Sequence, residues 1–271
     1  MNSYFLLLLS YLIVGVSALN SPPAGAITVG PGGAHSTLSA ALKDTSSEIY
    51  FIFPGTYTDT AIITRPNVRI YGQTDVPNSY TGNTSVAGSN DASGTVQVHA
   101  ANVSLYNLNI ANTYGKPVDQ AQAIALSVQA GQFGAYGLKI TGDQDTLLAN
   151  DGAQYYANSW IEGAVDFTIG DGFITASGRS SDDGNWYVID SSTVQGTGKA
   201  FLGRPWRDFA RVVFQKSTLG SNVTDHVTFA EYENAGPGAQ GPRASFSTQL
   251  GAPVSIQTVL NSTSWIDPAF L

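Results

Sequence analysis

The chain has 271 residues and no cysteine, so disulfide bonds and cysteine-ligated metal sites are excluded. Charged residues make up 12% of the chain, about half the usual share, and the net charge is −8 without any basic run. A nucleic-acid partner is therefore not expected.

Residues 1–18 form a short apolar segment that ends in Val16-Ser17-Ala18, a small-residue pattern typical of signal-peptide cleavage. The apolar run is too short to span a bilayer comfortably, and no basic stop-transfer flank follows it. We therefore predict a signal peptide at 1–18, one domain at 19–271, secretion to the extracellular space and no membrane association. Four glycosylation sequons agree with secretion: Asn83, Asn102, Asn222 and Asn261.

Residues 35–43 have apolar positions at helical spacing and predict one short helix that caps the N-terminal end of the fold. From residue 49 onwards, short strand-like runs alternate with Gly, Asn and Asp turns, and no helical period intervenes. The lack of crossover helices excludes a doubly wound α/β fold, whereas a β-sandwich stays open. The predicted strands are 49–53, 68–71, 95–99, 103–110, 124–128, 136–140, 186–189, 211–214 and 227–229, and the tail at 245–267 is expected to pack along the outside.

One pattern of isoleucine, glycine, aspartate and a closing aliphatic residue occurs twice, 21 residues apart, at 140–148 and 161–169. This offset fits one coil of a solenoid and favours an all-β, right-handed parallel β-helix over a sandwich. In such a helix Asp145 and Asp166 lie on neighbouring strands, about 4.8 Å apart. Stacked carboxylates repel each other, which indicates a catalytic acid pair; the alternative is two ordinary turn aspartates.

Several polar residues near these aspartates suit acid–base chemistry. Gln144 precedes Asp145 and Gln122 lies roughly one coil earlier, and their neutral amides can stabilise an oxyanion. Arg204 can pair with one aspartate and keep it ionised as a nucleophile, while the other aspartate suits proton transfer. Trp206 presents an aromatic face for a sugar ring. The structural alternatives are glutamines in a stacking ladder, an Arg–Asp clasp between coils and a packed indole.

No pattern in the sequence indicates a metal site or a serine nucleophile. His35, His99 and His226 are far apart, and neither His-x-His nor Glu-x-x-His spacing occurs, so we predict no metal. A Gly-x-Ser-x-Gly elbow is also missing. The carboxylates are therefore the main candidates for catalysis.

Five motifs occur in a fixed order that resembles the signature of pectin methylesterases (pectinesterases), especially their fungal branch. The motifs lie at 55–59, 122–126, 144–147, 166–170 and 202–206. The resemblance implies a pectinesterase, a hydrolase that cleaves the C6 methyl ester of galacturonosyl residues in pectin and releases methanol during cell-wall modification or degradation. It also implies a monomeric enzyme that acts on methylated homogalacturonan without a metal or an organic cofactor.

By motif match, the resemblance also assigns roles to individual residues. Asp166 would be the nucleophile, and Asp145 would protonate the departing methanol and then activate water. Gln122 and Gln144 would hold the oxyanion, and Arg204 would orient Asp166. Three residues are assigned to substrate contact: Trp206, Val165 and Ile169.

The chain departs from the family pattern by being short in three places: after residue 84, between 170 and 174, and within 217–227. A strand missing after Asp166 would displace Arg204, and positioning errors of about 1 Å are already costly in catalysis. The alternatives are a catalytically impaired, pectin-binding β-helix or the product of a misassembled coding region. A glycosidase or lyase on the same fold is a third hypothesis, although 12 lysines and arginines are few for a lyase.

Overall fold

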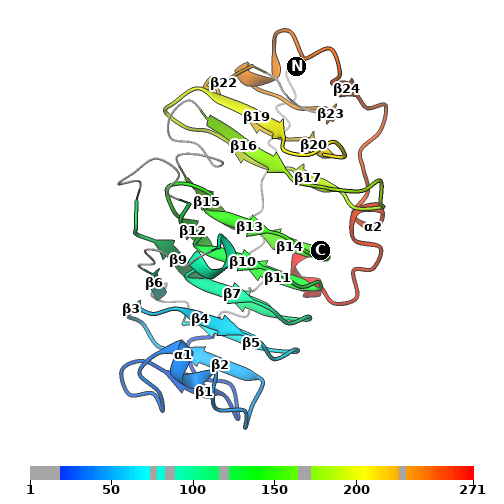
Figure 1. Ribbon diagram of the computed structural model, residues 1–271. Coiled ribbons are helices and arrows are strands. Elements are labelled where there is room, and N and C mark those ends of the chain that lie inside the picture. Colours follow the sequence, from blue (N-terminus) through cyan, green and yellow to red (C-terminus); the bar gives the residue numbers. More distant parts are fainter. Residues whose placement is uncertain (1–18, 74–77, 83–88, 116–121, 164–171, 226–229) are drawn as a thin grey trace, which may run out of the picture.

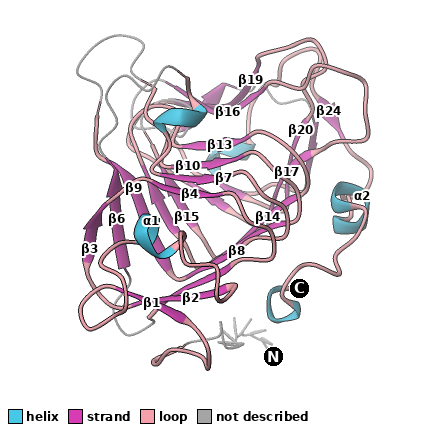
Figure 2. Ribbon diagram, turned by 60° about the horizontal axis from the view of Figure 1, so that its bottom comes forward, coloured by secondary structure: helices cyan, strands magenta, loops and turns pink. Residues whose placement is uncertain are grey.

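Short strands wind repeatedly through three directions, so parallel sheets run along the length of the molecule (Figure 1). This computed structural model describes residues 19–73, 78–82, 89–115, 122–163, 172–225 and 230–271. With the bottom of the molecule turned forward, the strands are seen to form three walls (Figure 2), and buried apolar side chains fill the space between them. The architecture is the predicted right-handed parallel β-helix, and it excludes the β-sandwich.

Each coil passes through three faces in a fixed order, and the first fifteen strands form a continuous stack, here called the first stack. Face 1 is the sheet β13-β10-β7-β4, face 2 is β1-β2-β5-β8-β11-β14, and face 3 is β15-β12-β9-β6-β3. The strand bounds on face 1 are β4 Ala61–Ile63, β7 Val96–Val98, β10 Leu126–Val128 and β13 Leu147–Ala149. On face 2 they are β1 Ile27–Val29, β2 Ile49–Ile52, β5 Arg69–Gly72, β8 Ser104–Tyr106, β11 Phe133–Tyr136 and β14 Gln154–Ala157. On face 3 they are β3 Thr56–Thr58, β6 Asn78–Gly82, β9 Leu108–Asn112, β12 Lys139–Thr141 and β15 Trp160–Glu162.

The remaining strands repeat the same order in a second stack. Its face 1 contains β16 Gly172–Ser177, β19 Ala200–Pro205 and β22 Val223–Asp225. Its face 2 contains β17 Tyr187–Asp190, β20 Val212–Gln215, β23 Ala230–Tyr232 and β24 Thr248–Gln249, and its face 3 contains β18 Thr193–Val194 and β21 Thr218–Leu219. The predicted strand at 227–229 lies outside the described residues.

In six coils the corner after the face 2 strand contains one residue in the left-handed backbone region. These corner residues have φ between 48° and 65°: Asn107, Gly137, Asn158, Ser191, Lys216 and Glu233. A positive φ turns the chain sharply without extra residues, and asparagine and glycine tolerate it best. The corners correct two predictions, because run 103–110 is divided at Asn107 and run 136–140 is divided at Gly137.

The 21-residue repeat corresponds to one coil. Leu126 pairs with Leu147 on face 1, Phe133 with Gln154 on face 2, and Ile140 with Ile161 on face 3. Identical apolar residues therefore stack at the same position of neighbouring coils on faces 1 and 3, which is why the pattern is visible in the sequence.

Helix α1, Leu38–Ala41, caps the N-terminal end and buries Leu38 and Ala41 against the core. It is shorter than the predicted 35–43, because His35 is extended and bridges to Val29 while the Thr37 hydroxyl caps the helix at Ala40 N. Short 3₁₀ turns occur at η1 Asp91–Ser93, η2 Pro237–Ala239 and η3 Pro268–Phe270.

The C-terminal tail packs along the outside of face 2, as predicted (Figure 1). Helix α2, Ile256–Leu260, contributes Leu260, which lies with Ile266 against Tyr106 and Tyr136. The Tyr155 hydroxyl donates to the carbonyl of Phe270 at 2.7 Å. Within the described ranges, no helix is long and apolar enough to cross a bilayer.

No strand pairing joins the two stacks within the described part of the chain. The interruption falls between β15 and β16, where residues 164–171 lie outside the description. Strands β10 and β11 are buried throughout, whereas β13 and β14 at the edge of the first stack are only partly buried. The interruption therefore coincides with the second predicted short segment, at 170–174.

Candidate active site

Asp145 lies just before β13 and has φ 61°, in the left-handed region. This bend interrupts the strand alternation that would otherwise send neighbouring side chains to opposite faces. Gln144 is 8% exposed and Asp145 is partly exposed. The bend therefore allows both side chains to serve one site, which a regular strand would not.

Bonds to both adjacent coils hold the backbone around this bend. Ala123 N donates to Gln144 O at 3.0 Å, and the fully buried Thr146 hydroxyl donates to Glu162 O at 3.1 Å. A Cβ on Gly142 would lie 2.8 Å from the Thr146 hydroxyl, so glycine at this position leaves room for that contact. The backbone on each side of the bend is thus fixed by hydrogen bonds between coils, which is the preorganisation that a catalytic side chain needs.

The two glutamines lie on adjacent coils, because Gln122 directly precedes the residue that bonds to Gln144. Gln144 Oε1 is buried and has no hydrogen-bond partner among the described residues. A buried amide without a ladder partner disfavours the stacking alternative for Gln144. Since the oxygen and nitrogen of an amide exchange places by a half-turn, the N–H₂ group can instead face a ligand.

Asn90 was not predicted as part of this site. Its Nδ2 donates to Asp145 Oδ2 at 3.4 Å, although the two residues are 55 positions apart in the sequence. No repeat or motif marks Asn90, so only the fold reveals the contact.

Arg204 and Trp206 belong to the second stack. Arg204 lies on β19, and its guanidinium carbon is 5.4 Å from the centre of the Phe173 ring, which stacks on Phe201 at 5.1 Å. Trp206 is 61% exposed and packs over Gly178, where a Cβ would lie 3.2 Å from the indole. The exposure disfavours a packed indole and leaves one ring face available for stacking.

The structure therefore brings together part of the predicted site. Gln122, Gln144 and Asp145 lie on adjacent coils of the first stack, whereas Arg204 lies on the second stack with β16 between them. Three predicted residues lie outside the described residues: Val165, Asp166 and Ile169. Pairing of Asp166 with either Asp145 or Arg204 stays a prediction.

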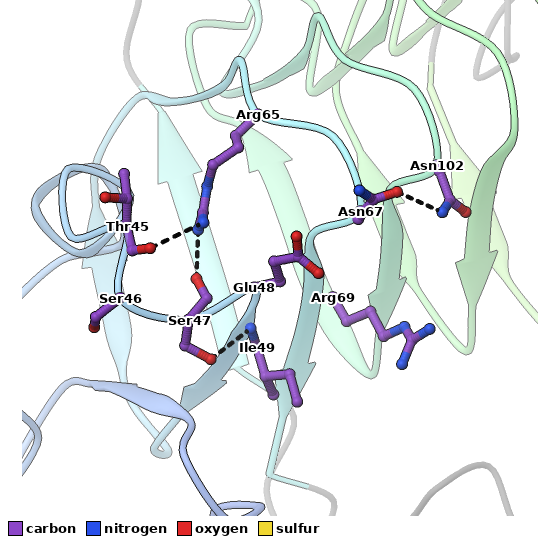
Figure 3. Close-up of a pocket in the computed structure, with 9 residues that line it drawn as sticks. All are labelled: Thr45, Ser46, Ser47, Glu48, Ile49, Arg65, Asn67, Arg69 and Asn102. Carbon is purple, nitrogen blue, oxygen red and sulfur yellow. Dashed lines mark hydrogen bonds between the residues drawn. The ribbon is translucent and has the colours of Figure 1, made fainter.

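Within the described ranges, no three histidine, aspartate or glutamate side chains are grouped to hold a metal ion. A depression of about 620 Å³ lies at the other end of the first stack and contains none of the predicted site residues (Figure 3). Arg65 crosses it and donates to Tyr50 Oη at 2.6 Å and to the carbonyls of Thr45 and Ser47. Arg65 thus serves the local backbone, and the depression, which Arg69 also lines, is separate from the candidate active site.

The fold places the chain among parallel β-helix proteins that carry polar residues, here Gln122, Gln144 and Asp145, on adjacent coils. Comparisons with known proteins identify the family within this fold class. A model of the pectinesterase family matches residues 28–178. A pectinesterase of Aspergillus aculeatus is 37% identical over 327 residues, which cover 97% of this chain and 98% of the relative. The chain belongs to the pectinesterase family. Its relatives are named pectinesterases, a class of carboxylic ester hydrolase, so the predicted family and enzyme class are confirmed.

Solved structures agree with this assignment. The pectin methylesterase of Aspergillus niger, in deglycosylated form, is 36% identical with a TM-score of 0.84, covering 93% of this chain and 100% of that chain. A pectin methylesterase in complex with a hexasaccharide is 19% identical with a TM-score of 0.71, covering 92% and 100% of the two chains, and shows the fold alone.

The alignment to the Aspergillus aculeatus protein is longer than this chain, so that relative contains residues with no counterpart here. This agrees with the predicted shortening.

Proposed function

We propose that this protein hydrolyses the C6 methyl ester of galacturonosyl residues in pectin and releases methanol. The observation that carries the proposal is the left-handed bend at Asp145, which joins a partly exposed carboxylate to a buried amide and lies beside the coil of Gln122. This is an acid beside oxyanion donors, on a member of the pectinesterase family. The family's solved complex with a hexasaccharide supports a sugar polymer as the substrate.

The proposed reaction has two steps. Asp166 attacks the ester carbonyl, Gln122 and Gln144 donate to the oxyanion, and Asp145 gives its proton to the departing methoxy group. The product is a mixed anhydride between Asp166 and the uronate. Asp145 then takes a proton from water, whose oxygen attacks the anhydride and regenerates Asp166. Arg204 keeps Asp166 ionised by pairing with it, and Trp206, Val165 and Ile169 contact the sugar.

We further propose that residues 1–18 are a signal peptide, that 19–271 is the secreted domain, and that the enzyme acts outside the cell as a monomer. A net charge of −8 favours highly methylated, nearly neutral pectin as substrate, because the de-esterified product is anionic and is repelled.

The test is methanol release from highly methylated pectin by the wild type and three variants. Asp166→Asn removes the nucleophile and should abolish release, and Asp145→Asn should lower kcat by about 10²–10⁴-fold, the usual contribution of a general acid–base. Asp143→Asn is the matched control, since it changes a carboxylate two residues away and should keep kcat within about threefold. A normal rate in Asp145→Asn would contradict the assignment.

The interruption between the stacks motivates a second candidate, a pectin-binding β-helix without esterase activity. Tight pectin binding by the wild type without methanol release would favour it. A fall in pectin viscosity without methanol would instead indicate a glycosidase or lyase.

A further inference from the structure

A loop formed by residues 89–94 is fixed to all three strands nearest to it by buried polar groups. On face 1, Ser127 Oγ donates to Asp91 Oδ1 at 2.6 Å, and His99 Nε2 lies 3.2 Å from Asp91 Oδ2. Ser127 is fully buried on β10, and His99 follows β7. Asp91 and His99 are partly exposed, but Ser127 is not, so breaking the Asp91–Ser127 bond would leave the Ser127 hydroxyl without this partner in a buried position.

Further bonds hold the other end of the loop. Gln97 Nε2 on β7 donates to Gly94 O at 3.0 Å, and Asn112 Nδ2 on β9 donates to Ser93 O at 3.1 Å. The Ser93 hydroxyl accepts from Ile124 N at 3.2 Å. The 5% exposed Ser93 is thus enclosed between two coils, and the loop has little freedom to move.

Asn90 is the residue of this loop that reaches the candidate active site. It precedes the 3₁₀ turn η1, where an asparagine would ordinarily use its side chain to cap the turn. Here the Ser89 hydroxyl accepts from Ala92 N at 3.2 Å, and the Asn90 side chain makes no cap bond. Its amide is directed instead to Asp145 Oδ2, at 3.4 Å.

We propose that Asn90 is a positioning residue for Asp145, and that the Asp91–Ser127 contact fixes the loop in the place where Asn90 reaches that carboxylate. An N–H donor on Oδ2 limits rotation of the carboxyl group, which leaves Oδ1 to carry the proton in the first step, and it favours the ionised form that accepts a proton from water in the second step. The inference rests on the proposed function only for the role of Asp145 in the reaction, because the hydrogen bond itself is a structural feature.

The experiment combines a titration with kinetics. The carboxyl carbon of Asp145 is followed by ¹³C NMR as the pH changes, in the wild type, Asn90→Ala and Asn90→Asp. Loss of the donor should raise the titration midpoint of Asp145 by about 0.5–1 pH unit in Asn90→Ala. Asn90→Asp should raise it further, because a second carboxylate is placed opposite the first.

In the same variants kcat should fall about threefold to tenfold with KM unchanged, since only the acid–base group is disturbed. Activity of Asn90→Asp should recover partly at low pH, where one of the two carboxylates is protonated. The matched control is Asn150→Ala, an exposed asparagine that follows β13 and donates to Gln129 Oε1 at 2.8 Å without a described contact to Asp145. It should leave the titration and kcat unchanged.

Ser127→Ala tests whether the Asp91–Ser127 contact holds the loop in place. If Ser127 acts through Asn90, the double variant Asn90→Ala, Ser127→Ala should be no worse in kcat than Asn90→Ala alone. If the losses in kcat of the two single variants multiply in the double variant, the role of the Asp91–Ser127 contact is overturned. If the titration midpoint of Asp145 is the same in Asn90→Ala and in the wild type, the positioning role of Asn90 is overturned. A wild type without esterase activity would refute the proposed function, while the titration would still decide this inference.

Discussion

The first and second stacks share one coil geometry but are stabilised differently. In the part of the chain that the structure describes, the first stack contains an apolar core of 24 buried residues, whereas the corresponding core of the second stack has seven. Among the described residues, every arginine–carboxylate ion pair lies in the second stack, around Arg179, Arg211 and Arg243. Burial of apolar surface is the larger and more reliable source of stability, and exposed ion pairs contribute little.

The site residues are divided between these two regions. Asp145 and the two glutamines belong to the stack with the larger apolar core, although Asp145 lies beside β13 at its partly buried edge, and Arg204 belongs to the stack with the smaller core. The acid–base half of the site is therefore supported by the larger core, while the position of the arginine depends on the smaller one. Mutations in each stack should therefore have distinct signatures.

The largest expected effect is in the first stack. Leu105 on β8 is fully buried in the apolar core, and Leu105→Ala should lower the free energy of unfolding by about 2–5 kcal/mol. Urea unfolding followed by circular dichroism measures the loss. Ile62→Ala on β4 is the control, because Ile62 is 47% exposed and little burial is lost. Equal losses in the two variants would contradict an apolar core as the main support.

The next effect separates the stacks. Glu231 on β23 is 2% exposed and accepts from Arg243 and from Asn234 Nδ2, the latter at 3.0 Å. Glu231→Gln leaves the arginine without its counter-charge and should cost about 3 kcal/mol. Hydrogen exchange should then accelerate in β19, β20 and β23 and stay unchanged in β5, β8 and β11.

Glu233→Gln provides the matched control for that experiment, since Glu233 is exposed at the adjacent corner. It should leave exchange in both stacks unchanged. Faster exchange throughout the first stack in Glu231→Gln would show that the two stacks unfold together.

The smallest effect concerns two tyrosines, one at the edge of each stack, and appears only at high pH. Burial raises the pKa of Tyr187 on β17 to about 12, and burial together with Tyr187 raises the pKa of Tyr156 on β14. The pKa in the folded protein lies above the ordinary value of about 10. The stability that these neutral phenols contribute is therefore fully present below pH 10 and is lost as the pH rises towards 12. Tyr187→Phe should raise Tm at pH 11 by about 2–4 °C relative to the wild type.

At pH 7 the same substitution should leave Tm nearly unchanged, because the hydroxyl is neutral in both the folded and the unfolded chain. Thermal melts across the pH range measure the difference. A wild-type Tm that does not fall between pH 10 and 12 would show that these phenols stay accessible to water in the folded protein.

The repeat and several strands, among them β2, β5, β7 and β10, could be predicted from the sequence because solenoid coils place similar residues at the same position. Ile140 and Ile161 are an example, since both are selected by the same interior environment on face 3. The one-residue corners were harder to see. Asn107 and Gly137 interrupt apolar runs without any proline or long turn, so the strand pattern continues across them.

The site was predictable only where its residues lie inside motifs. Gln144 and Asp145 are neighbours within the repeated pattern. Asn90 lies 55 positions before Asp145 in the sequence, on a loop that only the folded chain brings to the site. Such a contact leaves no local trace in composition or periodicity. The Asn90 amide can reach Asp145 because the Ser89 hydroxyl, rather than Asn90, accepts from the backbone N–H of Ala92. The sequence gives no sign of this contact either.

The single-residue corners between faces 2 and 3 bear on how this molecule can change its length. The same left-handed turn occurs at Asn107, Gly137 and Asn158 in one stack and at Ser191 and Lys216 in the other. In each of these coils the chain therefore turns from face 2 to face 3 in the same direction. Loss of one whole coil would therefore leave the direction of the remaining strands unchanged at this corner.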